Sequence, residues 1–95
     1  MQIDFSPRAD ADLEDIYRYT WSECGSAQAD QYVETFRAVI ASTQSEPWRV
    51  RPCPDIRRGY SRIMFGSHIA FLRQRAGRWI VVRILHERQD TRRHL

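Results

Sequence analysis

A single change in hydrophobic periodicity constrains the fold of this chain. From residue 7 to residue 43, apolar side chains recur every three or four positions, which is typical of amphipathic helices. From residue 56 to residue 87 they alternate or run continuously, which is typical of strands. Residues 45–55 contain three of the four prolines, and this segment is predicted to be a loop. With 95 residues, the chain is expected to form one domain over residues 1–95.

The first half predicts a helical hairpin. Ser6-Pro7 suits the N-cap and first turn of a helix over residues 7–24. Gly25 suits the position after the end of that helix, and Ser26 is expected to cap a second helix over residues 26–43. Because the connection is so short, the two helices must lie antiparallel.

The second half predicts a small sheet. Strands are expected over residues 2–5, 56–65, 68–75 and 79–87. Tight turns at Gly66-Ser67 and Ala76-Gly77 make the last three strands an antiparallel meander. The apolar run from Trp79 to Leu85 indicates a strand covered on both faces, and so a central one. The predicted fold is α+β in the order β-α-α-β-β-β, with the hairpin packed on one face of a small antiparallel curved sheet. The pattern does not determine which strand the first one joins. The predicted shared core is Leu13, Ile16, Phe36, Ile40, Phe71, Val82 and Ile84.

Charge is distributed unevenly between the two halves. Residues 1–46 hold 3 Arg and 9 acidic residues, a net charge of −6, whereas residues 47–95 hold 12 Arg and 3 acidic residues, a net charge of +9. All 15 basic residues are Arg, which suits bidentate binding of carboxylate and phosphate. A genomic bias towards Arg codons is an alternative explanation for the missing Lys, but it does not explain the segregation. A half this basic predicts a phosphate-bearing or acidic partner.

Several classes of protein are not supported by the sequence. Residues 1–7 have neither the basic nor the apolar region of a secretory signal, and no apolar run approaches the length of a membrane span. We therefore expect a cytoplasmic protein in which Cys24 and Cys53 are free thiols. Neither cysteine has the spacing of a metal site, and no Gly-rich phosphate loop or hydrolase motif occurs, so no metal and no cofactor are expected.

Four segments are similar to a known toxin family. They are Asp55-Ile56-Arg57-Arg58-Gly59-Tyr60, Gly66-Ser67-His68-Ile69-Ala70-Phe71, Val82-Arg83-Ile84-Leu85-His86 and Arg93-His94-Leu95. With the element order, they resemble the ParE branch of the RelE/ParE superfamily. The resemblance implies the toxin of a type II toxin–antitoxin pair with a role in plasmid stabilisation. ParE-like members inhibit DNA gyrase and RelE-like members cut mRNA on the ribosome. Both are held inactive by an antitoxin, here a ParD-like ribbon-helix-helix protein, whose C-terminal segment wraps the toxin.

The acid–base residues favour the ParE type of function. Cleavage of RNA by its 2′-OH needs a base, an acid and cations around the phosphate. Lys is absent and the last Tyr is Tyr60, which leaves His86, Glu87 and His94. Neighbours on a strand point to opposite faces, so His86 and Glu87 cannot serve one site without a bulge. His86 is expected to be structural, bonded to a loop carbonyl, and His94 to have either a packing or a functional role.

The chain is therefore predicted to be a non-catalytic gyrase inhibitor rather than an enzyme. A ribosome-dependent mRNA endoribonuclease of the RelE type remains the alternative, and a member that only binds antitoxin is the third possibility. Binding of nucleic acid by the chain alone is not expected, nor is any membrane association.

Two sets of residues are predicted to bind partners. Exposed charge in the tail and on the sheet predicts target contacts by Arg58, Arg83, Arg88, Arg92, Arg93 and His94. Aromatic residues off the helical stripe or in the Pro-rich segment, with arginines on the sheet, predict antitoxin contacts by Tyr19, Trp21, Trp48, Arg62 and Arg73. Each of these aromatic residues could instead simply cover the core. Any single arginine could instead be a solvated surface residue without a partner.

Overall fold

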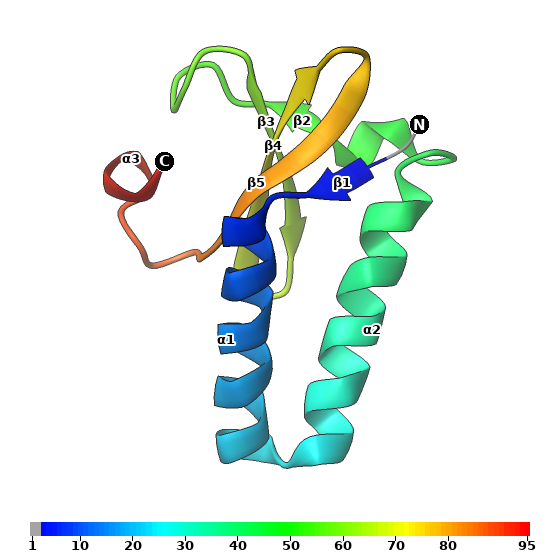
Figure 1. Ribbon diagram of the computed structural model, residues 1–95, viewed down its shortest axis with the longest axis vertical. Coiled ribbons are helices and arrows are strands. Elements are labelled where there is room, and N and C mark those ends of the chain that lie inside the picture. The colour runs from blue at the N-terminus through cyan, green and yellow to red at the C-terminus, as the bar shows by residue number, and fades with distance from the viewer. Residues whose placement is uncertain (1–2) are drawn as a thin grey trace.

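The structure is a computed structural model that describes residues 3–95 (Figure 1). Its elements are β1 (Ile3–Phe5), α1 (Pro7–Cys24), α2 (Ser26–Ser42), the 3-10 helix η1 (Pro47–Arg49), β2 (Arg51–Pro52), β3 (Tyr60–Phe65), β4 (His68–Arg75), β5 (Arg78–His86) and α3 (Thr91–His94). The predicted start of the first strand, residue 2, lies outside the described residues. Among those residues, no helix is both long and apolar enough to cross a membrane.

The helical hairpin forms as predicted, with one correction at its turn. The Ser6 hydroxyl accepts a hydrogen bond from the Ala9 N–H and donates one to the Val82 carbonyl, so the cap also ties α1 to β5. Gly25, at φ +90°, ends α1 and is also the N-cap of α2. Ser26 is therefore the first residue inside α2, and the prediction that its side chain caps this helix was wrong. With a single residue between the helices, one glycine has to serve both ends.

The sheet is mixed rather than wholly antiparallel. Its strand order is β1-β5-β4-β3-β2. β3, β4 and β5 pair antiparallel as the tight turns predicted, and β2, which was not predicted, pairs antiparallel with β3. β1 joins the edge of β5 in parallel, with Ile3 opposite Trp79. β5 therefore lies between two strands, which confirms the central position predicted for the apolar run from Trp79 to Leu85. The overall α+β architecture is confirmed (Figure 1).

The segment between the hairpin and the meander differs from its prediction. The predicted loop over residues 45–55 contains η1 and the two-residue strand β2. The predicted strand over residues 56–65 begins only at Tyr60, because the chain turns first. The N–H groups of Ile56 and Arg57 both bond to the Cys53 carbonyl, and Gly59 has φ +82°. These turn hydrogen bonds take the place of strand pairing before Tyr60.

The apolar core is divided by the sheet. Under the hairpin, Leu13, Phe36, Ile40 and Ile84 are buried together as predicted, with Ile16 half-buried against them. Phe71 is fully buried, but in a second cluster with Cys53 and Leu85, so its place in the shared core was wrong. Successive strand residues face opposite sides, and Phe71 follows Ala70, which faces the hairpin.

A β-bulge corrects the prediction for Val82. Phe71 pairs with Arg83 while the next residue, Leu72, pairs with Val81, which leaves Val82 as an extra residue in β5. The alternation shifts by one position there, so Val81 and Ile84 face the hairpin and Val82 is only half-buried outside the main cluster.

Candidate partner-binding surfaces

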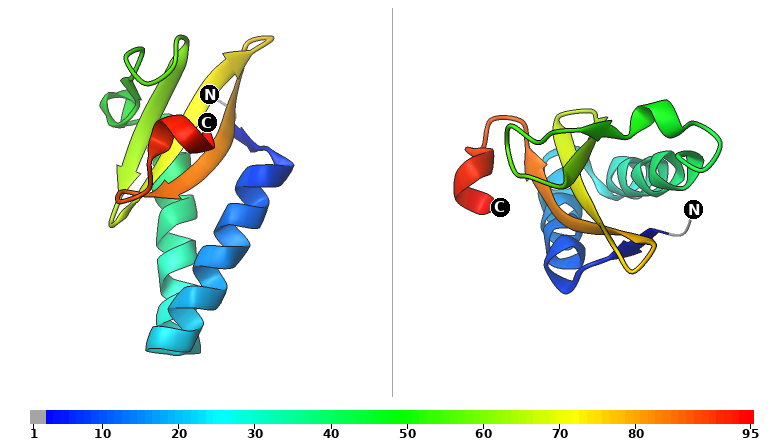
Figure 2. Two further views of the ribbon diagram at one scale, coloured as in Figure 1. Left: turned by 90° about the vertical axis from the view of Figure 1, so that its left-hand side faces the viewer. Right: turned by 90° about the horizontal axis from the view of Figure 1, so that it is seen from above.

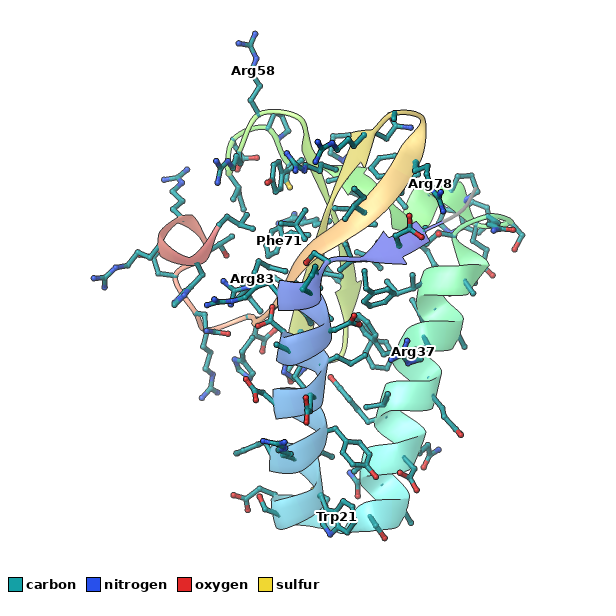
Figure 3. All side chains as sticks on the ribbon, in the orientation of Figure 1. Trp21, Arg37, Arg58, Phe71, Arg78 and Arg83 are labelled. Carbon is teal, nitrogen blue, oxygen red and sulfur yellow. The ribbon has the colours of Figure 1, made fainter. Side chains whose placement is uncertain are left out.

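An ion pair joins α1, β5 and the tail. The Arg83 guanidinium donates to both carboxylate oxygens of Asp12, from Nε at 2.8 Å and from Nη2 at 3.2 Å. Asp12 also accepts a hydrogen bond from the Ile84 N–H at 2.9 Å, and Arg83 donates from Nη1 to the His94 carbonyl at 2.8 Å. Both charged side chains are only 13% exposed. Figure 3 shows Arg83 between α1 and the tail. This arrangement fixes the position of the bulged strand.

The C-terminal tail is docked rather than free. Asp90 caps α3 by accepting a hydrogen bond from the Arg92 N–H. The Arg92 guanidinium donates to the Asp55 carbonyl, and Arg57 donates to Leu95. Leu95 packs on the second apolar cluster, on the side of β5 away from α2 (Figure 2). The tail therefore covers part of the core that the hairpin leaves open.

The predicted target residues lie in two places. Arg88, Arg92, Arg93 and His94 are exposed along the tail. Arg83, Arg93 and His94 line one cavity of about 690 Å³ with Arg8, which is not among the predicted target residues. Arg58 is exposed on the turn before β3 and points away from the molecule, far from Arg83 (Figure 3). Arg8 was missed because it lies far from the tail in sequence.

Two of the predicted antitoxin residues share a hollow at the edge of the sheet. Trp48 and Arg62 line this hollow of about 300 Å³ with Arg49, Arg51 and Met64. Arg51 and Arg62 are directly opposite each other on β2 and β3. Like charges in this position repel. The Arg62 Nε is buried and has no hydrogen-bond partner in the described chain. Trp48 and Met64 are 65% and 58% exposed, so the hollow combines unneutralised cations with apolar surface.

The remaining predicted antitoxin residues lie apart from this hollow. Arg73 is exposed on β4, opposite Tyr60. Tyr19 and Trp21 are 68% and 53% exposed near the end of the hairpin, which extends well beyond the sheet (Figure 3). Trp21 packs edge-on against the ring of Tyr17, but about half of its surface stays exposed. The predicted set therefore forms two surfaces, one at the sheet edge and one at the hairpin end.

A histidine pair was not found from the sequence. His68 and His86 are directly opposite each other on β4 and β5, with ring centroids 5.3 Å apart. The Tyr32 hydroxyl lies 2.8 Å from the His68 Nδ1. Burial, followed by the neighbouring His86, lowers the pKa of His68. Burial also raises the pKa of Tyr32.

His86 has a different partner from the one predicted. Its Nδ1 accepts a hydrogen bond from the Arg88 N–H at 3.1 Å, so the expected bond to a loop carbonyl was wrong. The reason is that the chain turns immediately after β5 and brings an amide, not a carbonyl, to the ring. Within residues 3–95, no group of three His, Cys, Asp or Glu side chains is placed to hold a metal ion.

The arrangement matches one known family along nearly its whole length. The family model described as the ParE toxin of the type II toxin–antitoxin system parDE matches residues 3–91. Toxin ParE1 of Mycobacterium tuberculosis is 40% identical over 91 residues, covering 95% of this chain and 93% of that protein. Toxin ParE1 of Caulobacter vibrioides is 37% identical over 90 residues, with the same coverage. A chain of the chromosomal ParDE system from P. aeruginosa has a similar fold, with a TM-score of 0.76, 19% identity and coverage of 90% and 95% of the two chains. The chain belongs to the ParE toxin family of type II toxin–antitoxin systems.

Proposed function

We propose that this ParE-family toxin inhibits DNA gyrase in the cytoplasm by binding it, without chemistry of its own, and that a ParD-like antitoxin neutralises it. The observation that supports a partner-dependent protein best is the pair of facing arginines, Arg51 and Arg62. Among the described residues, no carboxylate forms an ion pair with either one. Facing cations beside exposed apolar side chains favour a partner that brings carboxylates and apolar groups together.

The antitoxin is proposed to bind the toxin one to one as a clasp. Its carboxylates meet Arg62 and Arg73, and an apolar side chain packs on Trp48. A helical part of the same segment covers the aromatic end of the hairpin at Tyr19 and Trp21. A permanent complex of this kind is expected to bury about 2,000 Å² or more in total. Charged contacts at its rim should change the association rate and salt dependence more than the affinity.

The target surface is proposed to be the tail with the adjoining sheet. Arg88, Arg92, Arg93 and His94 are exposed there, and the Arg83 guanidinium is bonded to the tail through the His94 carbonyl. Arg58, on the turn before β3, lies apart from this surface and is proposed as a separate target contact. Removing a single bidentate arginine interaction should weaken target binding by about 1.5–3 kcal/mol.

The decisive test is expression of the full-length chain without antitoxin, followed by two assays. One measures supercoiling by purified gyrase, and the other measures mRNA cleavage with ribosomes. Inhibition of supercoiling without cleavage supports the proposal, whereas ribosome-dependent cleavage without gyrase inhibition overturns it in favour of the nuclease. If the chain affects neither reaction but still binds the antitoxin, its function is limited to antitoxin binding and the proposal is overturned.

Matched variants separate the two proposed surfaces. Removing residues 88–95 should abolish toxicity, but it would also uncover the second apolar cluster by deleting Leu95. Replacing Arg88 and Arg93 by Gln keeps Leu95 in place. This double variant should weaken gyrase inhibition at least tenfold and leave antitoxin affinity nearly unchanged. Arg62→Gln should weaken antitoxin binding and leave gyrase inhibition nearly unchanged. Arg75→Gln, at an exposed position on β4, is the control for charge removal alone.

The histidine pair is the one feature that favours the alternative function of an mRNA endoribonuclease. His68 and His86 line a cleft of about 410 Å³ together with Arg8. Two imidazoles and a guanidinium are groups that RNA cleavage uses. However, Asp12 and Asp15 line the same cleft and repel a phosphate. Loss of ribosome-dependent cleavage in His68→Gln would assign that activity to this cleft.

A further inference from the structure

A cavity of about 690 Å³ lies between the start of α1, the bulge of β5 and the tail. Arg8 lines it from α1, Val82 and Arg83 from β5, and Arg93, His94 and Leu95 from the tail. These segments are far apart in sequence and meet here because the Asp12–Arg83 pair and the His94 carbonyl fasten α1, β5 and the tail together.

The cavity is positively charged and largely unneutralised. Arg83 is already bonded to Asp12, so that pair adds little net charge. Arg8 and Arg93 are both exposed, and within residues 3–95 neither forms an ion pair. The main-chain oxygen of Leu95 accepts a hydrogen bond from Arg57. Two free guanidinium groups therefore line one cavity, one from α1 and one from the tail, where His94 lies next to Arg93.

We propose that this cavity binds a phosphate group carried by a nucleotide or by the backbone of a nucleic acid. A tetrahedral phosphate accepts hydrogen bonds from donors on different walls, whereas one planar carboxylate is satisfied by a single arginine fork. The cavity is open to solvent on one side, so a sugar has room beside the phosphate. The first turn of α1 is not the basis of the site, because the Ser6 hydroxyl already occupies the Ala9 N–H.

This inference rests on the proposed function, because Arg93 and His94 belong to the proposed target surface. It names the chemical group that these residues hold on the target. It also adds Arg8, which no sequence signal connected with the tail. The site is open and has few donors, so it should bind a free phosphate weakly and strengthen when a longer ligand brings further phosphates to the tail arginines.

The test is an NMR titration of the full-length chain at low ionic strength, following the backbone amides of Arg8 and Arg93. The probes are inorganic phosphate, adenosine monophosphate, a short single-stranded oligonucleotide and a glutamate-rich peptide. Arg8→Gln and Arg93→Gln should each weaken phosphate binding about tenfold or more. Arg75→Gln, which removes the same charge elsewhere, should leave phosphate binding within about twofold of its original strength. Tighter binding of adenosine monophosphate than of the oligonucleotide identifies a nucleotide site, and the opposite order identifies a nucleic-acid backbone.

Three outcomes would overturn the inference. One is the absence of any saturable shift at Arg8 and Arg93 with phosphate or with either phosphate ester. Another is equal weakening by Arg75→Gln, which would show general charge attraction. The third is binding of the glutamate-rich peptide at these amides more tightly than any phosphate probe, which would identify a carboxylate site. Gyrase inhibition is measured separately, so phosphate binding without inhibition refutes only the proposed function, and inhibition without phosphate binding refutes only this inference.

Discussion

Replacing Asp12 by Asn should strongly destabilise the fold although Asp12 lies on the surface helix α1. The carboxylate accepts two hydrogen bonds from the Arg83 guanidinium and one from the Ile84 N–H. Asn keeps the size of the side chain and one acceptor oxygen, but it removes the charge and turns an NH₂ group towards the arginine. Arg83, only 13% exposed, then loses its counter-charge, and it competes with the Ile84 N–H for the single Asn oxygen while keeping its hydrogen bond to the His94 carbonyl.

The magnitude follows from the burial of the pair. Removing one member of a fully buried ion pair costs about 3–5 kcal/mol, and the slight exposure here favours the lower value of about 3 kcal/mol. A domain of this length has a total stability of about 5–14 kcal/mol. A destabilisation of about 3 kcal/mol should lower the melting temperature by about 12–24 °C, and the urea midpoint by about 1–3 M.

Urea unfolding followed by tryptophan fluorescence and circular dichroism measures this destabilisation. Glu14→Gln on the same helix is the matched control, because the Glu14–Arg18 pair is highly exposed and its removal should cost less than about 1 kcal/mol. A double-mutant cycle with Arg83→Gln should give a coupling free energy above about 1 kcal/mol. If Asp12→Asn unfolds within about 0.5 kcal/mol of the unchanged protein, or if the coupling is near zero, the pair does not fix the bulged strand as argued.

Three further predictions test the core and the titratable groups. Phe36→Ala should cost about 3–5 kcal/mol in urea unfolding, and a cost below about 1 kcal/mol would show that this buried ring is not a core residue. Iodoacetamide should modify exposed Cys24 in the native protein and spare Cys53, whose side chain is 2% exposed and whose pKa is raised by burial; equal labelling by mass spectrometry would contradict this. Burial lowers the pKa of His68 in the folded protein, so as pH falls this imidazole is protonated in the unfolded chain before it is protonated in the folded one. The stability that His68 contributes above its ordinary pKa of 6.5 should be lost below it, and His68→Asn should flatten that pH dependence of unfolding.

The elements defined by local signals were predictable from sequence. Ser6 and Gly25 mark the ends of α1 through backbone geometry that few other residues provide. Likewise, the two tight turns establish the meander, because a two-residue turn leaves no other pairing within reach. The parallel placement of β1 depends on how the hairpin returns to the sheet, and no local pattern encodes that choice.

The bulge explains the largest errors within the sheet. From the Arg75–Arg78 pair, a regular antiparallel register would place His68 opposite Leu85. The extra residue Val82 shifts that register, so His68 instead pairs with His86. A bulge leaves no clear mark in a run of β-branched residues, and for this reason the histidine pair was not found. The same shift changed which of Val81 and Val82 enters the core.

The candidate surfaces were predictable as residue types but not as groups. The aromatic residues Tyr19, Trp21 and Trp48 and the tail arginines are exposed, as their positions in the sequence indicated, and their binding roles stay predictions. Their grouping follows from long-range contacts, such as the docking of Leu95 on the second apolar cluster. That docking places Arg93 near Arg8, and neither sequence spacing nor charge pattern relates those two residues.

The opposite charges of the two halves neutralise each other only at a few points. Within residues 3–95, three ion pairs join the acidic first half to the basic second half: Glu46–Arg49 at the boundary between them, Asp4–Arg78 at the sheet edge and Asp12–Arg83 beside the tail. The end of the hairpin extends beyond the sheet (Figure 1), and among residues 3–95 no carboxylate forms an ion pair with Arg51 or Arg62 at the sheet edge. Folding therefore leaves arginines at the sheet edge and in the tail whose positive charge a negatively charged partner would neutralise. Under the proposed function, the antitoxin supplies that charge to the arginines of the sheet edge and the target supplies it to the arginines of the tail.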